Sequence, residues 1–284
     1  MKKTLIALAV VASAVSGMAH AAPAWTNGDF NNVVNIGGSI IADDYRQKWS
    51  WAVGSNLSEF GNPLRDLTES GTKLIITVSG NKPILLGKTT EAFGVPVGGG
   101  VGSIPQITFT DYEGSVVELK NPEGVTNKGL AYVVLPMKNA QGTKIGSVKV
   151  NASYAGVRVS SQYKNVRSLY AARSAVIFYG GLPTNVSGSE LSSGYAAAER
   201  TKLFGSLSKD ELIEQVKAVR PDVTEYPDGQ SSNSENMQYG NNNVASAAYA
   251  LGIASGQTIE ATFDQAVTKN TQWSAPLNVK ITYN

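Results

Sequence analysis

Apolar and polar residues alternate along most of the chain, which indicates short β-strands. Alternation with period two places successive side chains on opposite faces of a strand, and the Gly, Asn, Asp and Pro residues between the runs mark turns. The runs fall at residues 73–79, 104–110, 116–120, 131–137, 145–154, 258–267 and 277–283, with a further strand expected within residues 45–54. We therefore expect an all-β protein whose antiparallel strands form a sandwich.

The period changes between about residues 156 and 243. Residues 168–178 and 195–204 are rich in helix-favouring Ala, Leu, Arg and Glu. Ser208 followed by Glu211 forms a capping box ahead of apolar residues at helical spacing, and Pro221 ends that helix. Residues 228–243 are polar, and we expect them to form a mobile loop. The pattern predicts a mostly helical insertion in the sandwich at about residues 156–243.

The first residues have the layout of a secretory signal peptide. Lys2 and Lys3 precede an apolar run at residues 5–15, and small residues follow at Ala19 and Ala21. The run is too short to cross a bilayer. We expect a signal peptide at residues 1–21, with cleavage after residue 24 as the open alternative.

Composition argues against catalysis and against a nucleic-acid partner. The chain has 24 basic and 22 acidic residues, so removal of Lys2, Lys3 and His20 with the leader leaves 22 of each and a near-neutral protein. The mature chain then has neither Cys nor His, which excludes a thiol nucleophile, a Ser-His-Asp triad and an ordinary zinc site. We expect no enzyme activity, no cofactor and no metal.

The two ends of the mature chain carry the strongest pattern. Near the start, apolar residues of one parity form a strand without an obvious hairpin partner: Phe30, Val34, Ile36 and Ile40. The chain ends in another alternating strand, with Leu277, Val279, Ile281 and Tyr283 on one face. Each is compatible with an ordinary terminal strand. Together they suit a subunit that lacks one strand and receives it from a neighbour, where four buried side chains contribute about 6–12 kcal/mol before ordering costs.

Several motifs resemble the FaeG-type major fimbrial subunits of enterobacteria, which the chaperone/usher route assembles. They are WTNGDFN at residues 25–31, IGGSI at 36–40, ADDYRQKW at 42–49 and QWSAPLNV at 272–279. Shorter matches occur at residues 129–132, 150–156 and 178–182. The resemblance covers nearly the whole chain.

This resemblance implies an incomplete immunoglobulin-like β-sandwich that is completed by donor strand exchange. Residues 22–41 would be the donor-strand extension, with Phe30, Val34, Ile36 and Ile40 as donor residues, and residues 42–284 the pilin domain. The strand carrying Leu277, Val279, Ile281 and Tyr283 would be the edge that the chaperone recognises. The implied partners are neighbouring copies, a periplasmic chaperone and an outer-membrane usher, and the implied location is a fimbrium on the bacterial cell surface, reached through the periplasm.

The family's major subunit also serves as an adhesin for host glycoprotein or glycolipid glycans, through its helical insertion. Tyr170 matches an aromatic associated with galactoside binding, but the arginine expected five residues later is Ala175 here. The resulting candidate glycan-binding set is Tyr170, Arg173, Tyr179, Lys164 and Arg167. Two alternatives stay open: Tyr170 packs on the sandwich, or the protein is a purely structural or antigenic surface-coat pilin. The basic cluster of Arg158, Lys164, Arg167 and Arg173 is either a solvated face or a site for an anionic ligand.

Overall fold

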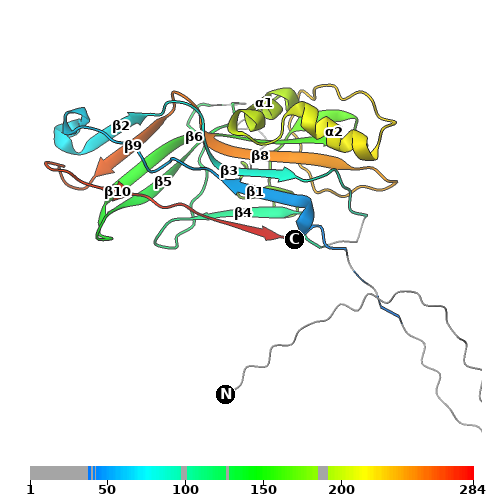
Figure 1. Ribbon diagram of the computed structural model, residues 1–284, viewed down its shortest axis with the longest axis horizontal. Helices are drawn as coiled ribbons and strands as arrows, with labels where there is room; N and C mark the ends of the chain where they lie inside the picture. The colour runs from blue at the N-terminus through cyan, green and yellow to red at the C-terminus, as the bar shows by residue number, and fades with distance from the viewer. Residues whose placement is uncertain (1–37, 40, 42, 97–100, 126–127, 185–190) are drawn as a thin grey trace, which may run out of the picture. The chain divides into compact units, whose positions relative to one another are not determined.

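The computed structural model shows an antiparallel all-β architecture, as the alternation predicts (Figure 1). It describes residues 38–39, 41, 43–96, 101–125, 128–184 and 191–284. The chain divides into two compact units, Met1–Ile41 and Ala42–Asn284, and all of the described strands and helices belong to the second. The expected donor residues Phe30, Val34, Ile36 and Ile40 lie outside the described residues.

Nine strands form the main sheet. They are β1 (Trp49–Val53), β2 (Lys73–Thr77), β3 (Lys82–Thr89), β5 (Leu130–Asn139), β6 (Lys144–Ser160), β7 (Asn165–Ser168), β8 (Ala245–Ile253), β9 (Thr258–Phe263) and β10 (Trp273–Ser274). Short 3-10 turns precede β1 and β2: η1 (Arg46–Lys48), η2 (Leu64–Asp66) and η3 (Glu69–Gly71). The 17-residue strand β6 pairs with β5 and then β7 along one edge, and with β9 and then β8 along the other. β6 therefore fixes the register of most of the sheet.

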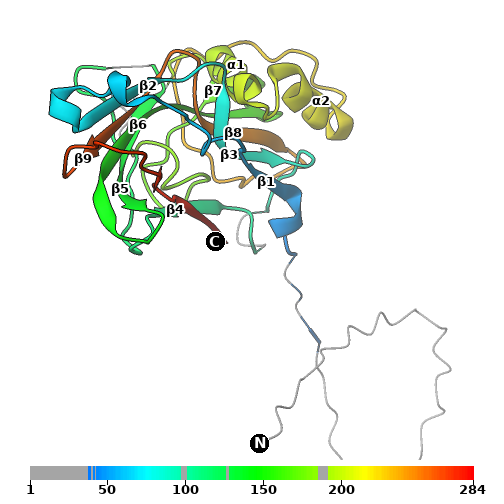
Figure 2. The ribbon, with the colours of Figure 1, turned by 60° about the vertical axis from the view of Figure 1, so that its left-hand side comes forward.

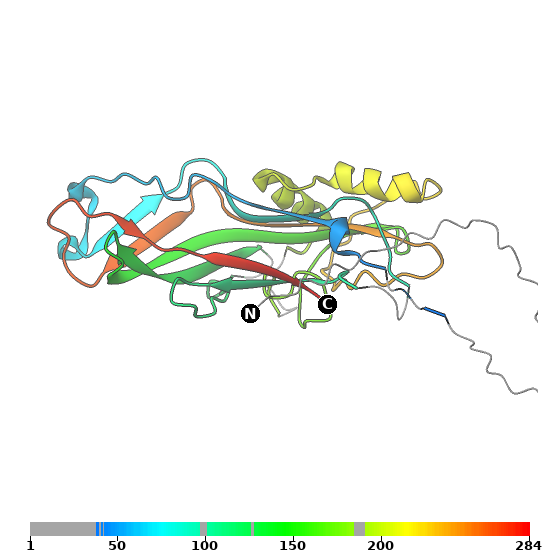
Figure 3. The same ribbon diagram turned by 60° about the horizontal axis from the view of Figure 1, so that its bottom comes forward.

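A second, two-stranded sheet is made by β4 (Pro105–Thr110) and β11 (Asn278–Tyr283). The two strands pair in full register, from Asn278 opposite Thr110 to Tyr283 opposite Pro105. Figure 3 shows this pair as a separate layer below the main sheet. Ile107 and Phe109 of β4 share the larger hydrophobic core with Tyr249 of β8, so the core lies between the two sheets.

Two α-helices cover the opposite face of β6 and β8 (Figures 1 and 2): α1 (Gly194–Phe204) and α2 (Lys209–Val219). The expected capping box is confirmed, because the amide of Glu211 donates to Ser208 Oγ (3.3 Å) and the amide of Ser208 donates to Glu211 Oε2 (2.7 Å). A second core joins Leu212 of α2 to Val157 of β6 and Ala248 of β8. β8 is consequently buried on both faces at all nine positions.

The prediction of a helix at residues 168–178 is wrong. Ser168 ends β7, and the residues after it form turns without regular helix. The backbone donors bond to distant segments instead of to the preceding turn: Leu169 N donates to Gly156 O and Ile177 N to Glu235 O, both at 2.8 Å. Phe178 also has a φ of 64°, which a right-handed helix excludes.

The mostly helical content expected for the insertion at about residues 156–243 is wrong as well. β6 continues without a break through residue 156 to Ser160, and β7 follows it. Among the described residues of 156–243, only α1 and α2 are α-helical, so the segment is not mostly helical.

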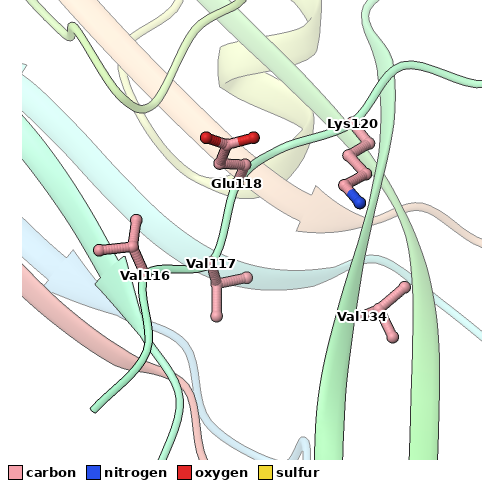
Figure 4. A pocket seen from close by; sticks show the side chains of 5 residues that line it. All are labelled: Val116, Val117, Glu118, Lys120 and Val134. Carbon is pink, nitrogen blue, oxygen red and sulfur yellow. The ribbon is translucent and has the colours of Figure 1, made fainter.

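The strand expected at residues 116–120 is an extended connection that changes partner. Val116 pairs with Thr110 beside β4, whereas Lys120 pairs with Tyr132 of β5. Figure 4 shows Val116, Val117, Glu118 and Lys120 on this connection, with Val134 on the neighbouring strand. The segment crosses from the two-stranded sheet to the main sheet, so it forms one isolated bridge with each and no continuous strand.

The polar loop at residues 228–243, which we expected to be mobile, has its middle packed into the protein. Glu235 lies inside it, with Oε2 at 3.0 Å from Nε of Arg158, and the two side chains are 4% and 1% exposed. The hydroxyl of Tyr239 and the amide of Met237 donate to the same carboxylate, each at 2.6 Å. Arg158 therefore pins the loop to β6 and is not part of a solvated basic face.

Arg158→Ala should lower the free energy of unfolding by about 3–5 kcal/mol, because it leaves the Glu235 carboxylate charged and unpaired in a buried site. Equilibrium unfolding in urea measures this. Arg173→Ala is the control, since it truncates an exposed arginine and should change stability by less than about 0.5 kcal/mol. Equal, small losses in both variants would contradict a buried ion pair that holds the loop.

Candidate functional site

β11 is paired along one edge and open along the other. Just beyond the end of β11, Asn284 and Ile104 exchange two backbone hydrogen bonds (3.1 and 3.4 Å). In this register the even-numbered residues of β11 direct their backbone N–H and C=O groups towards β4. Alternate residues of an antiparallel strand point their N–H and C=O groups to opposite edges. Val279, Ile281 and Tyr283 therefore direct these groups away from β4, where the described part of the chain provides no strand to pair with them.

The core-facing side chains of β11 are incompletely covered. Val279, Ile281 and Tyr283 alternate with exposed residues and are only half-buried, although they pack against the main core. A terminal strand of a closed sandwich would bury this face. The half-burial and the open edge together show that the core is exposed beside β11.

β1 has the corresponding open edge on the other side of the gap. It pairs with β3 at all five residues, and the described residues supply no partner for its second edge. Trp51 of β1 reaches across, and its indole Nε1 donates to the hydroxyl of Tyr283 at 3.0 Å. Figure 1 accordingly shows the C-terminus beside the start of β1.

A groove of about 1100 Å³ opens between these two edges. One wall is the chain from the end of β1 to Phe60, and the other runs from Thr271 through β10 to Val279 of β11. The floor is the inner face of the main sheet, formed by Ile84, Val133, Leu135, Val148, Val150, Ile253 and Ile259. The groove is thus a strip of core that no described residue covers.

The chemistry of this groove selects for an extended apolar segment. None of its described lining residues is charged, and the half-buried Leu57, Phe60, Trp273 and Leu277 add apolar side chains to its walls. Pockets for small molecules have volumes of about 300–1,000 Å³ and a few convergent polar groups. Here the polar groups are the aligned N–H and C=O groups of a strand edge, which bind another backbone.

The strand expected at residues 277–283 is confirmed as β11, whereas its role as the edge that a chaperone recognises stays a prediction. The groove walls were missed. Leu277, Val279, Ile281 and Tyr283 occupy the predicted face, with the strand itself starting at Asn278. The sequence analysis gave no site role to residues 53–60 or to Trp273, although both lie in the walls. A signal was available for β1, because Trp49 and Trp51 share one parity and Val53 continues it.

A second hollow, of about 180 Å³, lies between the connection after β4 and strand β5 (Figure 4). Glu118 and Lys120 line it together with exposed Val116 and Val134. It is small, and it combines two opposite charges with three valines, Val116, Val117 and Val134. This arrangement provides neither a strand edge of useful length nor a set of convergent polar groups.

The five candidate glycan-binding residues do not meet at one place. Lys164 is exposed in the turn between β6 and β7. The hydrogen bond from Arg220 is the main cause of the lowered pKa of Asp222, and the charge of Lys164 lowers that pKa a little further. Arg167 is half-buried and donates to the backbone and hydroxyl oxygens of Ser231. Tyr179 lies beside β4, where its carbonyl oxygen accepts from the amide of Ile107 (2.8 Å).

The remaining candidates lie on the irregular chain between β7 and Tyr179. Tyr170 is half-buried, and its amide donates to the carbonyl oxygen of Asn233 at 3.0 Å. Arg173 is exposed, and Tyr179 is 36% exposed. Three of the five candidate side chains, those of Tyr170, Arg173 and Tyr179, therefore lie within one short segment at the surface, whereas the guanidinium of Arg167 bonds to Ser231 of the packed loop.

The chain matches the family described as fimbrial major and minor subunits over residues 1–284. It belongs to this family. The subunit is 65% identical to K88 fimbrial proteins AD and AB of Escherichia coli, over 287 residues and 100% of both chains. The F41 fimbrial protein of Escherichia coli is 29% identical over 298 residues, again across the full length of both chains.

Membership in this family gives the subunit a place in a fimbrium at the cell surface. Within the described ranges no helix is long and apolar enough to cross a membrane. The same residues hold no group of three or more Asp, Glu, His or Cys side chains suited to a metal ion.

Gly87→Ala should destabilise the subunit by about 1–3 kcal/mol, because a Cβ at this position of β3 would clash with the indole ring of Trp51. Urea unfolding measures the loss, and the shift in tryptophan emission reports displacement of the ring. Gly61→Ala is the matched control, since no atom lies within 4 Å of a Cβ added there. Unchanged emission in Gly87→Ala would contradict this placement of Trp51.

Proposed function

We propose that the subunit polymerises by donor strand exchange, with the N-terminal extension of a neighbouring copy filling the groove between β1 and β11. The observation that supports this most is the uncharged strip of exposed core beside the free edge of β11. A strand placed there completes the backbone ladder and covers the half-buried side chains at once. The domain is then an incomplete immunoglobulin-like sandwich.

The N-terminal extension has the composition that this groove requires. Residues 30–41 carry no charge, and the nearest charged residues are Asp29 before them and Asp43 after them. Phe30, Val34, Ile36 and Ile40 fall on one face of an extended strand. An uncharged strand with one apolar face matches an uncharged groove with an apolar floor.

Chain length favours a donor from a second copy. Every strand pair in the described sheets is antiparallel, so we expect a donor antiparallel to β11, which leaves the groove at the end near Leu277. The domain instead begins beside the other end, where Tyr45 N bonds to Val101 O at 2.7 Å and Ile104 pairs with Asn284. The six residues of β11 span about 20 Å. The three residue-to-residue steps from Ile40 to Asp43 reach only about 11 Å. This is too short for the extension to fill the groove of its own domain and then run back along β11 to the start of that domain.

Before assembly the open edge needs a temporary partner, because exposed strand edges aggregate. A periplasmic chaperone that pairs with Leu277, Val279, Ile281 and Tyr283 would supply it, and an outer-membrane usher would exchange it for the next subunit. The signal peptide expected at residues 1–21 from the sequence would direct the chain to this export route through the periplasm.

We further propose that the subunit mediates adhesion to host glycoprotein or glycolipid glycans. Residues 170–179 combine two tyrosines with the exposed Arg173, and a sugar stacks its apolar face on an aromatic ring while its hydroxyls take hydrogen bonds. Lys164, which is exposed, and Arg167, which bonds to Ser231, lie outside this segment. The competing function is a structural or antigenic surface-coat pilin without its own receptor site.

Ile36→Asp should prevent the formation of long polymers, because a carboxylate without a partner would have to enter an apolar groove. Asn35→Asp is the matched control: it adds the same charge at the next residue, on the opposite face of the strand, and should assemble normally. Electron microscopy and the ladder of polymer lengths in gels measure the outcome. Long polymers from Ile36→Asp would exclude this donor strand.

Purified fimbriae on a glycan array should bind a defined set of sugars, and Tyr170→Ala or Tyr179→Ala should weaken that binding about tenfold, equivalent to about 1.4 kcal/mol. Tyr132→Ala, on the outer face of β5, is the aromatic control. If wild-type fimbriae bind no glycan, the surface-coat function replaces the adhesin.

A further inference from the structure

The groove closes before the end of β11. Its lining extends to Val53 on one wall and Val279 on the other. Ile281 and Tyr283 continue the free edge beyond that point, but they do not line the groove. At that end the side chains of Trp51 and Tyr283 meet across the gap in a 3.0 Å hydrogen bond.

The closure is built from the core and not from loose surface side chains. The indole of Trp51 lies over Gly87 of β3, where any larger residue would displace it. Its ring centre is 6.1 Å from that of Phe178, edge to face, and 6.5 Å from that of Tyr249. Phe178 packs in turn against Trp49 at 5.6 Å. The aromatic cluster therefore presents the indole N–H at a fixed point in the gap.

Tyr283 is the acceptor on the opposite wall. It is half-buried on the last residue of β11, and burial raises the pKa of its hydroxyl while the bond from Trp51 opposes that shift. Its backbone N–H and C=O point to the free edge by the alternation of the ladder. Tyr283 thus has a side chain that closes the gap and a backbone that an added strand would use.

We propose that the Trp51–Tyr283 hydrogen bond is a latch that a strand from a second copy must open to pair with the whole of β11. The strand enters at the open end, between Leu57 and Trp273, and pairs first beside Leu277 and Val279. Pairing beside Ile281 and Tyr283 comes last, because the strand has to pass between β1 and β11 where the two side chains meet. This inference rests on the proposed donor strand exchange and assigns Trp51 and Tyr283 as positioning residues for it.

The test uses the full mature chain, refolded from denaturant at low concentration, with an excess of a fluorescein-labelled peptide of residues 28–42. Fluorescence anisotropy follows capture of the peptide. Tyr283→Phe and Trp51→Phe keep an aromatic ring and remove the bond, so each should capture the peptide about 2- to 10-fold faster than wild type. The double variant should be no faster than the faster single variant, because both substitutions remove one interaction.

Tyr195→Phe is the matched control. It removes a hydrogen bond of similar length, from the Tyr195 hydroxyl to the carbonyl oxygen of Tyr226 (2.8 Å), in the helical layer away from the groove. This variant should lose stability in urea without any change in the capture rate. Tyr283→Phe that loses stability and also keeps the wild-type capture rate would reduce the bond to a structural contact and overturn the latch.

The outcomes separate the latch from the function on which it rests. If wild type and all variants fail to bind the peptide, donor strand exchange at this groove is wrong. If all bind it at the same rate, the groove accepts a strand but no latch controls its entry. The proposal is also overturned if the rate increase of the double variant equals the product of the increases of the two single variants, because the two substitutions would then act independently.

Discussion

The unpaired edge of β11 is the constraint on which the rest of the domain depends. A strand edge whose N–H and C=O groups lack partners is unfavourable, and beside β11 it coincides with a strip of core that the described chain leaves open. Side-chain repacking does not solve the first problem, because the unpaired groups of β11 belong to its backbone and the described residues offer no strand to pair with them. An added strand, as in the proposed donor strand exchange, would satisfy the backbone groups and cover the core together.

The remainder of the domain is arranged so that it holds its shape around this gap. β6 pairs on both edges along most of its length and ties together the strands on either side. The helical layer gives β6 and β8 a second core on their outer face, formed by residues such as Val157 and Leu212. Arg158 and Glu235 secure the loop that closes this layer. With two cores sharing the central strands, incompleteness of one does not leave the sheet unsupported.

The elements that sequence reasoning found are those with local signals. β2, β9 and β11 each turn one face towards the core, so their apolar and polar residues alternate. The Ser208–Glu211 capping box marks the start of α2 in the same local way. β8 was missed because it is covered on both faces and reads as a run of small apolar residues without alternation. The helix expected at residues 168–178 failed for a different reason. Its helix-favouring composition is overridden by long-range backbone bonds and by the left-handed conformation of Phe178.

The candidate site was predictable in part for the same reason. The parity of Leu277 to Tyr283 fixes which face of β11 meets the core, and that follows from the sequence alone. The opposite wall depends on β1 and β11 facing each other across sheets that are joined by long-range pairings, and no local pattern encodes this. The expected cluster of basic residues failed similarly. Arg158 and Lys164 are close in sequence, but β6 is buried at every position from Ala152 to Ser160, which includes Arg158, whereas a turn exposes Lys164.

The three layers also separate the two proposed activities. Assembly would use the gap between β1 and β11, on the inner side of the main sheet, whereas α1 and α2 lie on its outer side (Figure 3). Residues 170–179 are the exception, because Phe178 belongs to the aromatic cluster that holds Trp51, while its neighbour Tyr179 is exposed at the surface. A change in the helices can therefore alter the outer surface without reaching the groove. A change in this loop acts on both, since the backbone that presents Tyr179 is the one that fixes Phe178 beneath the closed end of the groove.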